Sequence, residues 1–144
     1  MSTFVKAWGP VFLWFALIFF FSTDTFSSEN TSRITNSFIL WIFPDASAGL
    51  LKTLDRFTRT VAHWSEYFIL ALLLIRAFRI QTNRWPRRWL GWTFAIVSVY
   101  ALGDEFHQIF VASRDPAWTD VMLDIFGGAC GVFWMYLRES KYRG

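Results

Sequence analysis

Four polar side chains lie close together in the apolar stretch YALGDEFHQIF, which covers residues 100–110: Asp104, Glu105, His107 and Gln108. In a helix, Asp104 would share a face with His107 at i+3 and Gln108 at i+4. A carboxylate beside a histidine can act as an oriented general base, and both are ligand types for divalent metal ions. The stretch therefore combines groups for acid–base or metal chemistry with apolar surroundings in which charge is costly.

Two further apolar segments carry ionisable side chains at helical spacing. In AHWSEYF, His63 and Glu66 are three positions apart, and Arg59 precedes His63 by four. Later in the chain, Asp120 and Asp124 are also four apart. Each set falls near one helical face, so each helix would present its polar groups together.

A glycine pair continues the face of the two aspartates. Gly127 and Gly131 have the GxxxG spacing, which lets another helix approach closely. Cys130 is the only cysteine, so the chain has neither an intramolecular disulfide nor a thiol metal cluster. We therefore expect a helix to pack beside the aspartates, and we do not expect redox chemistry.

The elements that must position these groups are membrane helices. With 54% hydrophobic and 21% aromatic residues among 144, the composition is that of a membrane protein without a separate soluble module. Four hydrophobic segments approach the roughly 20 residues that a spanning helix needs. The sequence predicts spans at residues 7–23, 61–78, 89–111 and 119–137. The expected fold class is all-α, with residues 1–144 as a single polytopic membrane domain.

The connection between the first two spans is more than a polar loop. Its apolar run 34–43 ends at Pro44 and is too short to cross a bilayer, so we expect an interfacial or re-entrant helix. After this run, Asp45 or Ser47 can cap a new helix whose apolar side chains fall on one face. The segment 33–60 is thus predicted to be amphipathic and to continue directly into the second span.

Basic side chains orient the predicted bundle. Lys and Arg accumulate near the two chain termini and between the second and third spans, and such residues favour the cytoplasmic side. Both termini are therefore predicted to be cytoplasmic. With this orientation, the polar ends of the predicted spans lie together in the outer leaflet. The sequence thus predicts a polar cavity that opens to the outside. Because topology accounts for the basic excess, we expect no nucleic-acid partner.

The polar cluster also has a simpler interpretation. A network of paired acids, arginines and histidines could serve only to fix helix packing. The whole cluster nevertheless favours a site, because Gly, Ser and Thr can pack membrane helices without burying charge, which costs roughly 2.5–3.5 kcal/mol per group on insertion scales. The residues leave open two kinds of site. One is a metal-assisted or acid–base hydrolase or transferase acting on a lipid phosphate or ester, and the other holds an anionic head group with arginines.

Three stretches together resemble the VanZ-like family of bacterial integral membrane proteins. They are FFFSTDTFSSENTSR, RTVAHWSEYFILALLL and LGDEFHQIFVASRDPAWTDVMLDIFGGACG, and they cover most of the chain. The resemblance implies about four helices in the bacterial cytoplasmic membrane. The founding member is associated with resistance to teicoplanin, a glycopeptide that acts on cell-wall precursors outside the membrane. The resemblance therefore implies a role in the cell envelope.

The residues and the resemblance together define a candidate site. The catalytic candidates are His63, Glu66, Asp104, Glu105 and His107. The candidates for ligand binding are Arg59, Tyr67, Gln108, Arg114, Asp120 and Asp124. If a divalent metal ion is the cofactor, its ligands are expected among His63, Glu66, Asp104, His107 and Asp124.

The leading prediction for function is an amphiphilic ligand bound in the outward-facing cavity. The ligand would be a membrane lipid, a lipid-linked cell-wall precursor or a lipoglycopeptide. The sequence leaves open whether the protein also modifies this ligand. It equally leaves open a scaffold role, in which Gly127 and Gly131 engage another membrane protein, and it does not fix the oligomeric state.

Overall fold

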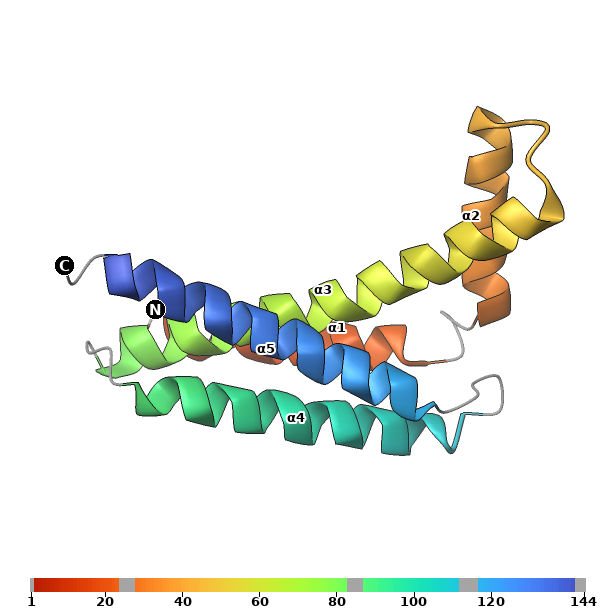
Figure 1. Cartoon of the computed structure of the whole chain (residues 1–144). Coiled ribbons are helices and arrows are strands. Elements are labelled where there is room, and N and C mark those ends of the chain that lie inside the picture. Colours follow the sequence, from red (N-terminus) through yellow and green to blue (C-terminus); the bar gives the residue numbers. More distant parts are fainter. Residues whose placement is uncertain (1, 24–27, 83–86, 112–116, 142–144) are drawn as a thin grey trace.

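The computed structural model describes residues 2–23, 28–82, 87–111 and 117–141. Five α-helices account for nearly all of them (Figure 1): α1 Thr3–Phe21, α2 Ser28–Ile42, α3 Ala48–Thr82, α4 Arg88–Gln108 and α5 Trp118–Lys141. No strand occurs within these described ranges. The predicted all-α fold class is confirmed.

Four of the helices, α1, α3, α4 and α5, run side by side as a bundle, and both chain ends lie at one end of it (Figure 1). α3 is central, because it packs against α1, α4 and α5, while α4 also packs against α5. The chain direction alternates from each bundle helix to the next. The end of α1, the first half of α3, the end of α4 and the start of α5 therefore meet at the end away from the termini.

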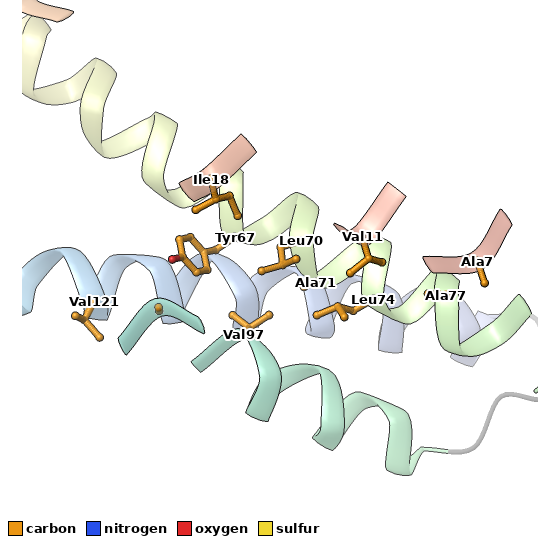
Figure 2. Packing of buried hydrophobic residues seen from close by; sticks show 11 residues of the cluster. Ala7, Val11, Ile18, Tyr67, Leu70, Ala71, Leu74, Ala77, Val97 and Val121 are labelled. Atoms are coloured by element: carbon orange, nitrogen blue, oxygen red, sulfur yellow. The ribbon is translucent and has the colours of Figure 1, made fainter. Parts of the chain in front are cut away.

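Helical periodicity on α3 builds the core. Its buried apolar residues recur every three or four positions: Tyr67, Leu70, Ala71, Leu74 and Ala77. Figure 2 shows them in a row, with residues of α1 on one side and of α4 and α5 on the other: Ala7, Val11, Ile18, Val97 and Val121. With 3.6 residues per turn, this spacing places one apolar stripe of α3 against its neighbours. Apolar packing thus holds the bundle along most of its length.

The glycines of α5 allow α3 to come very close. A Cβ atom added to Gly127 would collide with the backbone carbonyl oxygen of Trp64. One added to Gly131 would lie 2.8 Å from another carbonyl oxygen of α3. Gly128 faces α4 instead, where a Cβ atom would collide with Val97. The close approach predicted from the GxxxG spacing is confirmed, and the approaching helix is α3 of the same chain.

Three of the described helices, α1, α3 and α5, are long and apolar enough to cross a membrane. α4 has 21 residues, which is the length of a spanning helix, but the polar residues near its end lower its mean hydropathy: Asp104, Glu105, His107 and Gln108. The protein is thus a polytopic helical membrane protein. The crossing by α4, third of the four predicted spans, stays a prediction that its packing between α3 and α5 supports.

α2 and the first turns of α3 extend away from the bundle (Figure 1). α2 packs against α3, and Ser32 Oγ donates a hydrogen bond of 2.8 Å to Asp55 Oδ2. The connection between the helices contains Pro44, and Ser47 Oγ caps α3 by accepting a 3.3 Å hydrogen bond from the amide of Leu50. α3 then continues for 35 residues, so residues 48–60 of the predicted amphipathic segment lie on one helix with the second hydrophobic segment, whereas residues 33–42 belong to α2.

Candidate functional site

A histidine and an aspartate join α3 to α5 beside the α5 glycines. His63 Nδ1 lies 3.2 Å from Asp124 Oδ1, and the two side chains are 17% and 3% exposed. Asp124 precedes Gly127 by nearly one turn, so the close helix approach there brings its carboxylate to the histidine. With Nδ1 held by the carboxylate, the ring is oriented and Nε2 is the nitrogen left for proton transfer. The arrangement can serve as an oriented general base.

A second carboxylate, Asp104, is buried on α4. Gln108 follows it by about one turn and donates a 3.1 Å hydrogen bond from Nε2 to Asp104 Oδ2. Ser22, the cap residue that follows α1, has its hydroxyl close to Asp104. Among the described residues, neither Asp104 Oδ1 nor Ser22 Oγ has a hydrogen-bond partner. Because buried polar atoms are nearly always partnered, a small shift that joins the Ser22 hydroxyl to the Asp104 carboxylate would satisfy both groups.

These groups line a cavity of about 270 Å³, which we call the polar cavity. Its lining residues are Ile18, Phe21, Ser22, Thr31, Arg59, Ala62, His63, Glu66, Asp104 and Gln108. They come from the end of α1, the start of α2, the first half of α3 and the end of α4. The structure thus brings five of the predicted site residues into one space: Arg59, His63, Glu66, Asp104 and Gln108.

A larger cleft of about 690 Å³ adjoins the polar cavity and shares Arg59 and His63 with it. Its ionisable residues are Lys52, Asp55, Arg56, Arg59, His63 and Asp120, and we call it the charged cleft. Lys52 and Arg56 were not among the predicted site residues. They precede Arg59 by seven and three positions on α3, a helical spacing that could have identified them. The predicted ligand-binding residue Asp120 lies in this cleft.

Tyr67 lies in the core and not in the lining of either space. It is fully buried, and Figure 2 shows its ring among the apolar side chains between α3 and its neighbours. Its ring centroid is 6.3 Å from that of Tyr100, and it is close to both Asp104 and Asp124. Among the described residues its hydroxyl has no hydrogen-bond partner. Tyr67 therefore belongs to the apolar core and not to the walls of either space.

Glu105 makes a backbone contact at the start of α5. Its Oε1 accepts a hydrogen bond from the amide of Ala117, the residue before α5 begins. An acid at a helix N-terminus satisfies a free amide and interacts favourably with the helix dipole. Glu105 is not among the residues that line the polar cavity or the charged cleft. The structure thus gives this catalytic candidate a contact that fixes the approach of α5.

His107 faces a different space from His63. Its ring centroid lies 4.6 Å from that of Phe19 on α1, and among the described residues its Nδ1 is buried without a hydrogen-bond partner. It lines an apolar groove of about 450 Å³ between α1 and α4. Asp104 lines both this groove and the polar cavity. The two predicted catalytic histidines therefore lie in separate spaces that meet at Asp104.

The predicted metal ligands do not form a common site in the part of the chain that the structure describes. Within it, no group of three or more His, Cys, Asp or Glu side chains is arranged to hold a metal ion. His63 and Asp124 are in contact, but Glu66 and Asp104 do not join them in such a group. Arg114, the remaining predicted binding residue, is outside the described residues.

Comparisons with known proteins gave one match. The sequence model of a protein family described as VanZ/LLP1 matches residues 7–139. Neither the curated proteins nor the solved structures gave a match. The matched range covers all five helices nearly completely, and it includes every residue that lines the polar cavity and the charged cleft.

Proposed function

This chain belongs to the VanZ/LLP1 family, and we propose that it binds an amphiphilic ligand at the outer leaflet of the bacterial cytoplasmic membrane. The ligand would be a membrane lipid, a lipid-linked cell-wall precursor or a lipoglycopeptide. One observation carries the proposal, which is the convergence of five polar residues from two helices on one cavity: Arg59, His63, Glu66, Asp104 and Gln108.

Helix packing does not account for this convergence. Glycines make the close contact of α5 with α3, and an apolar stripe makes the contact of α3 with α1. In the polar cavity, by contrast, the buried Asp104 carboxylate lies beside the Ser22 hydroxyl, and burial of a carboxylate is costly. Ionisable groups inside membrane helices face the bundle interior or a water-filled cavity, and they often mark the path of a substrate.

The residues of the charged cleft support the proposal that the ligand has a polar head group, which would lie at the entrance to the polar cavity. Lys52, Arg56 and Arg59 supply cationic donors that suit phosphate or carboxylate oxygens. Asp55 and Asp120 supply acceptors for hydroxyl or amino groups in the same cleft. A head group that carries both kinds of function is thus the class that fits.

The outward orientation of the cavity is part of the proposal. Both chain ends lie at the opposite end of the bundle (Figure 1), and near them Arg76 Nη1 donates a 3.2 Å hydrogen bond to the carbonyl oxygen of Lys6. Basic residues at that end favour the cytoplasm. In a Cys130→Ser background, a membrane-impermeant maleimide should label Asp45→Cys but not Gln81→Cys in intact cells. Labelling of only the second variant would invert the topology.

Lipid analysis tests the ligand site directly. Protein extracted into nanodiscs with native lipids is compared with Asp104→Asn, which keeps the side-chain shape but removes the charge. We expect one co-purifying lipid class to fall by roughly fivefold, the factor that corresponds to about 1 kcal/mol of lost contact. Melting should stay unchanged or rise, since binding sites are held at a cost in stability.

Glu139→Gln is the matched control, because it removes an acid at the opposite end of the bundle. Its lipid profile should equal that of the wild type. Identical profiles for all three proteins, identified by mass spectrometry, would contradict the ligand site. Teicoplanin itself is tested by antibiotic susceptibility of a host that expresses the wild type or Asp104→Asn, and equal susceptibility in both would remove it as a ligand.

An acid–base hydrolase or transferase is the second candidate function. The observation that favours it is the buried contact of His63 Nδ1 with Asp124 Oδ1, because a carboxylate-oriented histidine that lines a cavity can take a proton from water or a hydroxyl. Turnover of a fluorogenic lipid ester or lipid phosphate by the wild type, and its loss in His63→Gln, would support this reading. Equal low rates in both proteins would remove it, while leaving ligand binding intact.

A further inference from the structure

The groove between α1 and α4 differs from the polar cavity in chemistry and in position. Apart from its polar end, its main lining residues are Phe19, Trp92, Ile96, Val99, Tyr100 and Gly103. The only polar atom on these side chains besides the Trp92 indole nitrogen is the Tyr100 hydroxyl, which donates a 2.7 Å hydrogen bond to the carbonyl oxygen of Phe15. The groove therefore offers an apolar wall along about half of α4.

This groove opens to the outside of the bundle. Phe19, Trp92 and Val99 are 50%, 59% and 70% exposed, so the wall faces the surroundings that the membrane would fill. α1 and α4 touch through Tyr100 with Phe15 and through His107 with Phe19, but their backbones approach each other less closely than each approaches α3. A gap between two membrane helices with such a lining suits a hydrocarbon chain that enters sideways from the bilayer.

The groove ends at two polar side chains, Asp104 and His107, with which the hydrocarbon chains of bilayer lipids cannot form hydrogen bonds. His107 Nδ1 is buried, and among the described residues it has no hydrogen-bond partner, as is the case for Asp104 Oδ1. Asp104 lines the groove and the polar cavity alike. A hydrocarbon chain bound in the groove would therefore place its attached polar group at the wall of the polar cavity.

We propose that the α1–α4 groove binds a single hydrocarbon chain of the amphiphile whose head group occupies the polar cavity. This inference rests on the proposed function and narrows it to ligands that have a chain beside a hydroxyl or amide group. Such a group would lie beside the Asp104 and His107 side chains, which line the polar end of the groove. Asp104 is then the residue at which head-group and chain recognition meet.

Two glycines of α4 provide a matched test. A Cβ atom added to Gly103 or to Gly91 meets nothing within 4 Å, but only Gly103 lines the groove. Leucine at either position raises helix propensity in the same way, so Gly103→Leu fills the groove and Gly91→Leu leaves it open. The probe is a monoacylglycerol with a photoactivatable diazirine in its chain, added to each protein in phosphatidylcholine nanodiscs.

In the wild type we expect crosslinks to concentrate on the peptides of α1 and α4 that contain Phe19 and Val99. Gly103→Leu should lower the yield at these peptides by about fivefold or more, which corresponds to about 1 kcal/mol or more of lost binding. Gly91→Leu should leave the yield unchanged. If Gly103→Leu does not fold, Val99→Trp against Leu102→Trp provides the same contrast, since only the first position lines the groove.

Crosslinks spread evenly over the exposed apolar residues of α5, such as Phe133 and Trp134, with equal yields in both glycine variants, would overturn the inference. A change in particle mass caused by Gly103→Leu would also overturn it, because it would assign the groove to a second copy of the chain. The proposed function fails separately, through identical lipid profiles in the wild type and Asp104→Asn. If crosslinking shows no selectivity for the groove but the lipid profile still depends on Asp104, only the proposed chain-binding site is refuted.

Discussion

Polar contacts join α3 to α5 at both ends of the bundle, and their surroundings differ. His63 Nδ1 lies 3.2 Å from Asp124 Oδ1, and Arg79 Nη1 lies 3.4 Å from Glu139 Oε1. The side chains of the first contact are 17% and 3% exposed, but those of the second are 62% and 18% exposed. Nearly equal distances therefore join one contact that has a buried carboxylate and one ion pair that has an exposed guanidinium.

Burial of the Asp124 carboxylate in the first contact costs free energy that helix packing alone does not require. An exposed ion pair contributes little to stability, and either end of the bundle could be closed with such a pair. A buried contact loses the hydration of its carboxylate, which is expensive in an apolar interior. The buried pair also adjoins a cavity, whereas the exposed pair lies at the end that carries the chain termini. This difference supports the proposal that the polar end of the bundle binds a ligand and that the basic residues at the other end set the topology.

Gly127→Leu should have the largest effect on stability, because it disrupts the α3–α5 contact at the polar end of the bundle. The added side chain would collide with the backbone of Trp64, which cannot move aside as a side chain can, so α5 must separate from α3. We expect a loss of more than about 3 kcal/mol in the free energy of unfolding, above the usual range for overpacking. Denaturation in detergent measures it, with Gly91→Leu as the control that meets no atom. Wild-type stability of Gly127→Leu would contradict the close approach of the two helices.

Asp124→Ala should have the next largest effect. It leaves His63 beside an empty space and removes a carboxylate that is 3% exposed, and breaking a buried pair in this way costs about 3 kcal/mol, the lower end of the usual range. Asp124→Asn keeps an acceptor for the histidine and should recover most of that loss. Melting temperatures of both variants measure the difference. Equal destabilisation by alanine and asparagine would show that volume, and not the polar contact, sets the cost.

The sequence predicts the helices and several of their contacts because these depend on local spacing. Gly127 and Gly131 of α5 recur at the helical period, which needs no knowledge of distant residues, whereas the position of Tyr67 in the core stripe of α3 was not predicted. The amphipathic residues before the second span indicate one long helix for the same reason. Convergence of the polar residues at one end of the bundle follows from the alternating chain direction, which the charge pattern already indicates.

Sequence spacing could not predict which cavity or contact each of several neighbouring residues of α4 belongs to. Asp104 and Glu105 are adjacent, yet one lines the polar cavity and the other binds the Ala117 amide before α5. Successive residues point about 100° apart on a helix, and the rotation of α4 against its neighbours decides which of them faces a cavity. The same rotation turns His107 toward Phe19 and the groove. That rotation depends on the packing of all four bundle helices together.

Glu105→Ala should have a smaller effect that is confined to stability. Loss of the contact with the Ala117 amide at the start of α5 should cost about 1 kcal/mol, as for other helix caps. The co-purifying lipids should match those of the wild type, in contrast to Asp104→Asn. Melting and lipid profiles of the two variants, measured side by side, test the division between these neighbours. A changed lipid profile in Glu105→Ala at unchanged stability would instead return Glu105 to the site.

Glu139→Gln should have the smallest effect, because it removes one partner of the exposed pair. Arg79 is 62% exposed in this contact, so water replaces the lost carboxylate and salt already weakens the attraction. We expect a change of at most about 0.5 kcal/mol, as for most surface ion pairs. The free energy of unfolding, measured at low and at high salt, checks this, and the small difference from the wild type should vanish at high salt. A loss comparable to that of Asp124→Ala, or one that persists at high salt, would mean that both ends of the α3–α5 contact carry similar stability. In that case burial of the His63–Asp124 contact would no longer mark the polar end as the part of the bundle built at a cost.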